Sequence, residues 1–303
     1  QPSYSLFDYH CKTYNIPYEP WHLTPELEYD YENLPKLGPD SVLIVTTPNN
    51  PVGNTVDAEK LESILANNPE AFIILDAVYC EFCEMDIAPL VRKYQNLIVL
   101  RSFSKAFPIA GLRLGYLCAS PQTAAIVKKL VLQFSITHFS LIFAREMLFN
   151  PEFMENSRKR VREIIAERER MYHILNREFD RDVLKVFKSA GNFLLVRIFD
   201  DAVYAHLLAD LETAGIKVLN TSKAPLLYNT FRVSIGSPTE NAAFLQCLHN
   251  SLAKEARNNE ALVAMLAECL RTDLPQATAS GVALPRNTWR RPKLDQTAAG
   301  RRA

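Results

Sequence analysis

The sequence predicts an α/β domain built on a mostly parallel sheet, followed by a smaller α+β domain. The first half of the chain holds four short runs of apolar and β-branched residues, and segments of helical spacing separate them. Strands that are apolar on both faces and alternate with helices are typical of parallel sheets. The expected strands are 41–47, 71–75, 97–100 and 114–118, and the expected helices are 56–66 and 121–132.

The pattern changes after Pro151, where a long and highly charged helix is expected at 152–179. Helices packed over a few strands indicate a second, smaller domain. The expected strands are 183–187, 193–198, 216–219 and 231–235, and the expected helices are 202–214 and 240–252. We therefore predict a large domain over 1–150, a small domain over 151–255 and an appended segment over 256–303.

The appended segment is predicted to hold one helix at 260–270 and then a disordered tail. From Gln276 onward the sequence has no periodicity, and six Lys or Arg residues stand against one acid, Asp295. Such a basic tail could bind RNA or lipid, but most tails of this composition are solvated and disordered.

The overall composition is typical of a soluble globular protein, with 48% hydrophobic and 22% charged residues. The 34 Lys and Arg residues are balanced by 34 Asp and Glu residues, so net charge predicts neither a nucleic acid nor a membrane as a partner. No apolar run is long enough to span a bilayer.

Among the six cysteines, only Cys80 and Cys83 are close in sequence. A CxxC pair could bind metal or carry out redox chemistry, but a second ligand pair of similar spacing is missing. Packing as small apolar groups is the favoured interpretation, so we expect no metal site. Unpaired cysteines fit a reducing compartment, and we expect the protein to be cytoplasmic.

Polar side chains follow three of the expected strands. Asn50 follows the first, Asp76 and Tyr79 follow the second, and the third leads into Ser102, Ser104 and Lys105. Ligands of open parallel sheets bind beyond the carboxyl ends of the strands. Three adjacent strand ends span about 10 Å, the length of a pyridine ring with its phosphate arm. Each group alone has an ordinary interpretation as a cap or turn residue, but their convergence favours a binding site.

Four segments resemble the signature segments of the class I/II pyridoxal-phosphate-dependent aminotransferases, which have the fold-type-I architecture. They are PNNPVG (48–53), ILDAVYCEF (74–82), SFSKAFPIAGLRLGY (102–116) and FRVSIGS (231–237). The Ser-x-Ser-Lys sequence with an arginine eight residues after the lysine is the most specific of them. The doubled asparagine and the AGLRLGY segment resemble the histidinol-phosphate aminotransferases most closely. The resemblance runs from residue 1 to about residue 250.

The resemblance implies that pyridoxal 5'-phosphate is the cofactor and that Lys105 binds it covalently and moves the proton at the substrate carbon. Asp76 would pair with the ring nitrogen and keep it protonated. Tyr79 and Asn50 would donate to the ring oxygen.

The remaining roles that the resemblance implies concern phosphate, ring and substrate. Ser102, Ser104 and Arg113 would hold the cofactor phosphate. Tyr4 would stack on the ring, and Arg232 would clamp the anionic group of the substrate. Asn192 matches a residue that approaches the substrate, although Gly-Asn is also a common turn.

The implied partners are an amino donor and a 2-oxo acid acceptor, here histidinol phosphate and 2-oxoglutarate, with a homodimer as the assembly. A guanidinium such as that of Arg232 accepts both phosphate and carboxylate. Threonine-phosphate decarboxylase shares the fold and most of these residues, so it is an alternative, as is a non-catalytic relative.

The chain departs from the family pattern in three places. Asp76-Ala77-Val78-Tyr79 stands where the family reads Asp-Glu-Ala-Tyr, and Val52 replaces a common threonine. The chain begins at Gln1, and the family's glycine-rich phosphate loop, N-terminal arm and intersubunit tyrosine would all precede that residue. We therefore expect that the 303-residue chain alone has little or no activity.

Overall fold

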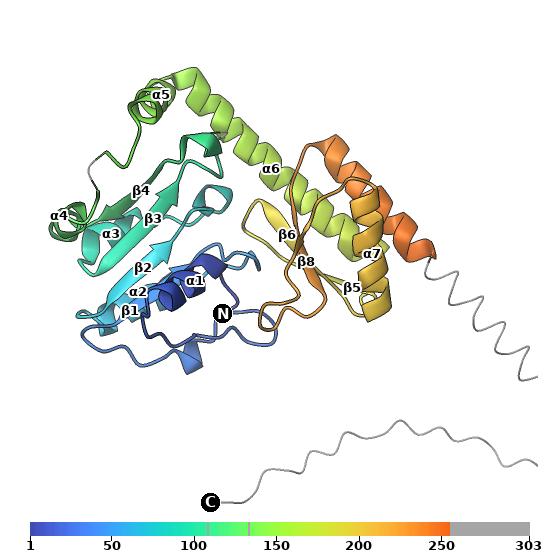
Figure 1. Ribbon diagram of the computed structural model, residues 1–303, viewed down its shortest axis with the longest axis horizontal. Helices are drawn as coiled ribbons and strands as arrows, with labels where there is room; N and C mark the ends of the chain where they lie inside the picture. The colour runs from blue at the N-terminus through green and yellow to red at the C-terminus, as the bar shows by residue number, and fades with distance from the viewer. Residues whose placement is uncertain (108, 133, 255–303) are drawn as a thin grey trace, which may run out of the picture. The chain divides into compact units, whose positions relative to one another are not determined.

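The computed structural model describes residues 1–107, 109–132 and 134–254 (Figure 1). Within them the strands form two four-stranded sheets. The first sheet belongs to the first half of the chain and the second sheet to the second half. The helix predicted at 260–270 and the basic tail from 276 lie outside the described residues.

The first sheet has the order β1-β2-β3-β4. Its strands are β1 (Val42–Thr46), β2 (Phe72–Asp76), β3 (Leu97–Ser102) and β4 (Gly115–Ala119). The first three run parallel, and β4 runs antiparallel to β3. The expectation of an α/β fold with a mostly parallel sheet is therefore confirmed, and the three strands that carry the candidate residues are direct neighbours.

Helices α2 (Ala58–Asn67), α3 (Ala88–Lys93) and α4 (Pro121–Lys128) alternate with these strands. The side chain of Asp57 caps α2 by accepting from the backbone N–H of Lys60 at 2.9 Å. The apolar face of α2 (Leu61, Ile64, Leu65) is buried against the sheet residues Ile73 and Leu75. Helix α3 and two further helices, α1 (Ser5–Thr13) and α5 (His138–Leu148), were not predicted.

Helix α6 (Pro151–Glu178) links the two halves and is 28 residues long. Asn150 caps its start, and Pro151 occupies the first turn, where proline costs no hydrogen bond. Figure 1 shows α6 running from α5 to the second sheet. Arg168, Met171 and Leu175 are spaced along one buried face of this helix.

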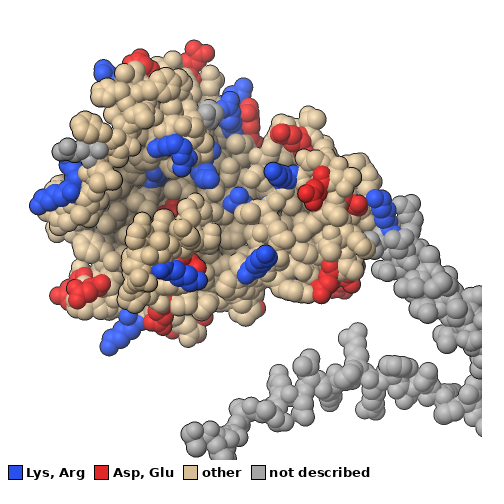
Figure 2. Space-filling model, in the orientation of Figure 1, with Lys and Arg blue, Asp and Glu red and all other residues tan. Residues whose placement is uncertain are grey.

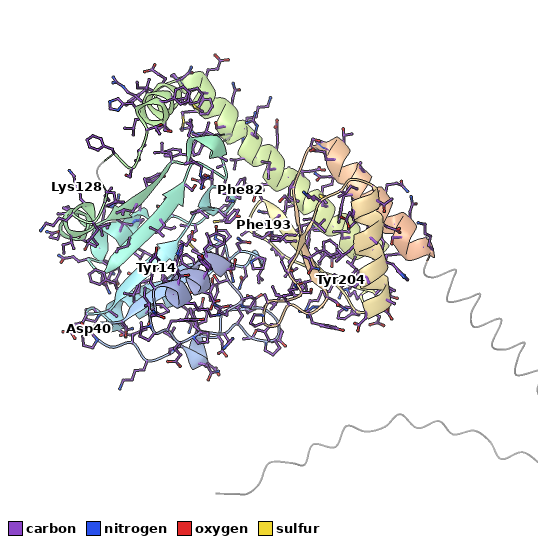
Figure 3. All side chains as sticks on the ribbon, in the orientation of Figure 1. Tyr14, Asp40, Phe82, Lys128, Phe193 and Tyr204 are labelled. Carbon is purple, nitrogen blue, oxygen red and sulfur yellow. The ribbon has the colours of Figure 1, made fainter. Side chains whose placement is uncertain are left out.

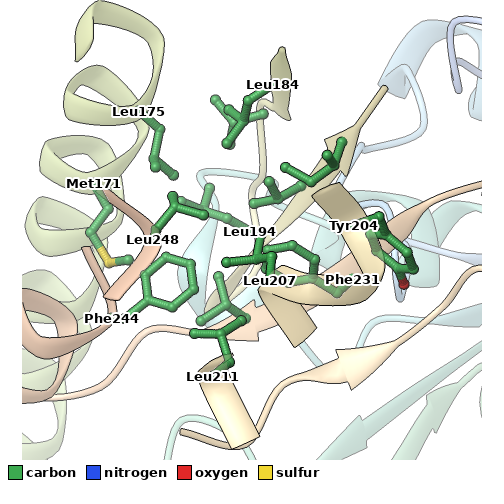
Figure 4. Close-up of a cluster of buried hydrophobic side chains, with 14 of the residues drawn as sticks. Met171, Leu175, Leu184, Leu194, Tyr204, Leu207, Leu211, Phe231, Phe244 and Leu248 are labelled. Atoms are coloured by element: carbon green, nitrogen blue, oxygen red, sulfur yellow. The ribbon is translucent and has the colours of Figure 1, made fainter. Parts of the chain in front are cut away.

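The second sheet is antiparallel throughout, with the order β5-β6-β8-β7. Its strands are β5 (Leu184–Phe187), β6 (Phe193–Ile198), β7 (Leu219–Asn220) and β8 (Thr230–Ser234). Helices α6, α7 (Asp201–Thr213) and 238–254 contribute to its core. In Figure 4, Leu194 and Phe231 of the sheet pack among Met171, Leu207 and Phe244 of these helices. The expected elements of this half are all present, and the strand expected at 216–219 is a two-residue strand that begins at Leu219.

On the face shown in Figure 2, Lys and Arg side chains are interspersed with Asp and Glu. Among the described residues, no helix is long and apolar enough to cross a membrane. In the same part of the chain, no cluster of three or more His, Cys, Asp or Glu residues is arranged to hold a metal ion.

Candidate active site

Asp76 is the last residue of β2, where it is paired with Thr46 of β1 and Leu100 of β3. Its side chain is buried, with 5% of its surface exposed. Burial raises the pKa of Asp76, while the backbone N–H of Val78 and the charge of Lys105 oppose that rise. Val78 supplies the one hydrogen-bond donor to this carboxylate among the described residues, at 3.2 Å.

Lys105 lies in the turn that follows β3. The turn is closed by the hydroxyl of Ser102, which accepts from the backbone N–H of Ser104 at 3.0 Å. Phe103 and Ala106 are buried on either side, whereas Lys105 is exposed, so its neighbours anchor the backbone and leave the amine free. The Lys105 Nζ lies 5.1 Å from the centroid of the Tyr79 ring. The turn thus places the Lys105 amine near the ring of Tyr79, in the segment that follows β2.

Tyr79 joins the two halves through Phe193, the first residue of β6. The two rings meet edge to face with their centroids 5.2 Å apart. Phe82 and Ala106 belong to the same buried cluster, and Figure 3 shows Phe82 and Phe193 between the two sheets. Lys105 and Tyr79 therefore rest on a packed apolar base.

Arg232 of β8 reaches across to Asn50 at the end of β1. Its Nη1 donates to Asn50 Oδ1 at 2.5 Å. Its guanidinium carbon lies 4.9 Å from the centroid of the Phe193 ring. The Nε of Arg232 is buried without a hydrogen-bond partner among the described residues. A buried guanidinium N–H with no partner is costly in isolation and is suited to receive an anion.

The residues expected to hold phosphate are only partly brought together. Ser102 and Ser104 share the turn after β3, but Arg113 is exposed and its Nη1 donates to the carbonyl of Ala110 at 3.1 Å. Arg113 adopts a left-handed conformation, with φ of 52°. No hydrogen bond joins Arg113 to either serine within the described residues.

Tyr4 and Asn192 are the candidates that the described structure joins least to the rest of the site by side-chain contacts. The chain before Tyr4 is tied to the end of β1, because the Pro2 carbonyl accepts from Asn49 Nδ2 at 3.0 Å. The Tyr4 ring itself is 40% exposed and contacts Phe7 edge to face. Asn192 is half-buried, and its carbonyl accepts from the backbone N–H of Ile235 at 2.9 Å. In the described structure, neither side chain forms a hydrogen bond with another candidate residue.

Two features at the site escaped the sequence analysis. Arg168 of α6 is 7% exposed, and its Nη1 donates to the carbonyls of Phe82 at 3.2 Å and Gly191 at 2.8 Å. It therefore joins the segment after Tyr79 to the segment before Asn192. A charged residue at helical spacing with Met171 and Leu175 was a signal for this role.

Gly53 makes the second connection. Its carbonyl accepts from the backbone N–H of Ala190 at 2.7 Å, and its φ of +95° is one that L side chains rarely adopt. A Cβ on Gly53 would lie 2.3 Å from the Ser189 hydroxyl oxygen. The PNNPVG turn thus needs glycine where it approaches the second half of the chain.

A cavity of about 1080 Å³ lies beside the site and includes none of Asn50, Asp76, Lys105 or Arg232. It is lined by residues after β2 and β3, by α6 and by the 188–190 segment.

Comparison with known proteins identifies relatives over most of the chain. The histidinol-phosphate aminotransferase 1 of Carboxydothermus hydrogenoformans is 36% identical over 207 residues, which are 68% of this chain and 56% of the relative. The histidinol-phosphate aminotransferase of Ruminiclostridium cellulolyticum is 31% identical over 214 residues, which are 71% of this chain and 57% of the relative. The chain therefore spans little more than half the length of these curated relatives.

Solved structures give the same picture. The histidinol-phosphate aminotransferase of Clostridium acetobutylicum superposes with a TM-score of 0.72 at 25% identity, covering 85% of this chain and 76% of that one. The L-threonine-O-3-phosphate decarboxylase of Porphyromonas gingivalis has a TM-score of 0.68 at 22% identity, covering 83% and 75%. At this lower identity the likeness shows the fold alone. The sequence model of aminotransferase class I and II matches residues 1–248, and the chain belongs to that family.

Proposed function

We propose that the protein is a pyridoxal-phosphate-dependent aminotransferase that exchanges an amino group between histidinol phosphate and 2-oxoglutarate. The observation that carries the proposal is the placement of the Lys105 amine 5.1 Å from the Tyr79 ring, next to the buried carboxylate of Asp76. Family membership over residues 1–248 and the similarity to histidinol-phosphate aminotransferases support it.

The residues at the strand ends fit the chemical groups of pyridoxal phosphate. Asp76 is a buried carboxylate with one backbone donor, so a protonated ring nitrogen would supply the cation that it lacks. Arg232 keeps a buried N–H that has no hydrogen-bond partner among the described residues, which fits an anionic substrate group beside the ring. When bound, the cofactor supplies an electron-withdrawing ring to the substrate carbon.

The chain's own residues would hold and move protons around that ring. Lys105 would bind the cofactor and then transfer the proton at the substrate Cα, because its amine is exposed and forms no ion pair within the described residues. Asp76 would keep the ring nitrogen protonated, and Tyr79 and Asn50 would donate to the ring oxygen. Ser102, Ser104 and Arg113 would hold the phosphate, with Tyr4 against the ring.

Substrate selection would depend on Arg232, whose planar guanidinium can bind a phosphate and a carboxylate in turn. Asn192 would approach the same substrate. The proposal includes a cytoplasmic homodimer, as the resemblance of the sequence to this family implies.

The direct test is covalent trapping on the full chain. Pyridoxal phosphate is added, the protein is reduced with borohydride, and peptides are mapped by mass. We expect the modification on Lys105 and its loss in Lys105→Ala, whereas Lys128→Ala, a change at an exposed lysine of α4, should be labelled as the wild type is. Labelling that persists elsewhere at equal yield in Lys105→Ala would refute the assignment.

The substrate is tested separately, on a catalytically active form of the enzyme. Glutamate formation from 2-oxoglutarate in the presence of histidinol phosphate supports the proposed transfer, and Lys105→Ala should reduce it to background. Carbon dioxide release from threonine phosphate, with no glutamate formed, would instead identify a decarboxylase like the Porphyromonas gingivalis protein.

A further inference from the structure

Cys80 and Cys83 lie in one closed turn directly after Tyr79. The backbone N–H of Cys83 donates to the carbonyl of Cys80 at 3.3 Å, which ends the 3-10 turn Cys80–Phe82. A turn closed in this way brings the two Cα atoms within about 7 Å, and disulfides span Cα separations of roughly 4.4–6.8 Å. The backbone therefore already holds the two residues at a separation compatible with a disulfide.

Both thiols point into this short segment. The Sγ of Cys83 lies 3.4 Å from the carbonyl oxygen of Cys80, and the Sγ of Cys80 lies 3.5 Å from that of Met85. Both sulfurs belong to the short segment Cys80–Met85, and each affects the pKa of the other.

The two cysteines differ in access. Cys80 is buried, with 6% of its surface exposed, whereas Cys83 is partly exposed and lines the cavity of about 1080 Å³. A cavity of that size admits a small organic molecule. An external reagent can therefore reach Cys83 first, while Cys80 lies behind it.

The charges around Cys83 favour its thiolate. The neighbouring Cys80 thiol, the backbone N–H of Met85 and the charge of Arg168 lower the pKa of Cys83 to about 7, against the opposing effects of burial and of Glu81. The pKa of Cys80 is raised by the neighbouring Cys83 sulfur and by burial. The accessible sulfur is the nucleophilic one.

We propose that Cys83 is a modification site for low-molecular-weight disulfides and that Cys80 resolves the product. The Cys83 thiolate attacks one sulfur of the reagent, its S–S bond breaks, and one thiolate leaves and takes up a proton. Cys80 then loses its proton and attacks the Cys83 sulfur, which releases the second thiol. The protein loses two electrons and forms one disulfide, and the reagent is reduced to two thiols. Such reversible disulfides are the kind found in reducing compartments.

The turn is also tied to the rest of the molecule. The carbonyl of Phe82, between the two cysteines, accepts from the buried Arg168.

The proposal does not rest on the proposed function, because it concerns the chemistry of the turn alone.

The test uses the full chain and glutathione disulfide at pH 7, with alkylation of remaining thiols and peptide mapping by mass. We expect the wild type to form a disulfide between Cys80 and Cys83, which lowers the mass of the peptide by two hydrogens. Cys80→Ser should instead retain one glutathionyl group on Cys83, and Cys83→Ser should acquire neither product in this turn.

Cys247 in the same chain is the internal control, because burial raises its pKa. At pH 7 a larger fraction of Cys83 than of Cys247 is thiolate, but a thiolate of lower pKa is intrinsically less nucleophilic. We therefore expect Cys83 to react at least about fivefold faster than Cys247 at pH 7. Equal rates in the wild type, or wild type that retains glutathione on Cys83 without forming the link, would overturn the proposal. Both readings come from unsubstituted protein and do not depend on how the variants fold.

Discussion

Asp76 occupies an environment that is unfavourable for a charge. Burial raises its pKa above the ordinary value of 3.8, and the Val78 N–H and Lys105 only partly compensate. The folded chain therefore binds a proton on this carboxyl more tightly than the unfolded chain does. The free energy of unfolding falls as pH rises through that range, so the ionised group costs stability at neutral pH.

Asp76→Asn should consequently raise the stability of the cofactor-free protein at pH 7. The gain should shrink as pH falls toward 4, where the carboxyl becomes protonated. Urea unfolding at the two pH values measures the difference, and Asp40→Asn, at an exposed position, is the matched control. A variant less stable than wild type at pH 7 would contradict this account of the site.

The same substitution should impair catalysis. An amide in place of the Asp76 carboxylate would leave the cofactor ring poorly protonated, and loss of comparable electrostatic groups costs about 3 kcal/mol in the barrier. Turnover of histidinol phosphate by the active enzyme measures this loss. A reduction smaller than tenfold, about 1.4 kcal/mol, would exclude the role assigned to Asp76.

At the scale of elements, the PNNPVG turn depends on close approach to the 188–190 segment. Gly53→Ala combines a strained φ with a Cβ that would lie 2.9 Å from the Ser189 Cα. Because backbone atoms cannot yield as a flexible side chain does, we expect a loss of about 1–3 kcal/mol in the free energy of unfolding.

Gly111→Ala is the control for that loss, because no described residue lies within 4 Å of its Cβ position and its φ is not positive. This substitution should change stability by less than about 0.5 kcal/mol. Equal effects of the two substitutions in urea denaturation would show that the Gly53 contact is unimportant.

The elements also show where sequence reasoning succeeds. β1, β2 and β3 are continuous apolar runs, which predict a parallel sheet, and the three strands pair in parallel, although Val42, Ile44 and Phe72 are exposed. The antiparallel direction of β4 could not be predicted, because an apolar run carries no information about the direction of the strand in the sheet. Helix α1 buries no residue, so it lacks the apolar face that periodicity detects.

Within the candidate site, the polar residues that follow β1, β2 and β3 could be predicted to converge, because parallel strands end at the same edge of a sheet. Arg168 was missed although it shares helical spacing with the buried Met171 and Leu175, because the sequence does not show that buried carbonyls accept from one of the six arginines of α6. Its partners Phe82 and Gly191 are 86 and 23 residues away in sequence, so only the folded chain joins them.

At the scale of the whole described molecule, Arg168 connects the two halves through its hydrogen bonds to Phe82 and Gly191. Arg168→Ala would leave the carbonyls of Phe82 and Gly191 without their buried donor, which should cost about 2–4 kcal/mol in the free energy of unfolding. Arg177→Ala, at a side chain of the same helix that is 75% exposed, should cost less than about 0.5 kcal/mol. Urea unfolding compares them, and an Arg168 variant as stable as the Arg177 variant would refute this role.

The hydrogen bond between Asn50 and Arg232 joins residues 182 positions apart. A ribosome adds roughly 5–20 residues per second, so Asn50 emerges roughly 10–40 s before the residue that holds it. Lys105 and Asp76 leave the exit tunnel during that interval, when no Arg232 yet exists. The Lys105 side of the candidate site is thus made before Arg232, the residue proposed to bind an anion, is added to the chain.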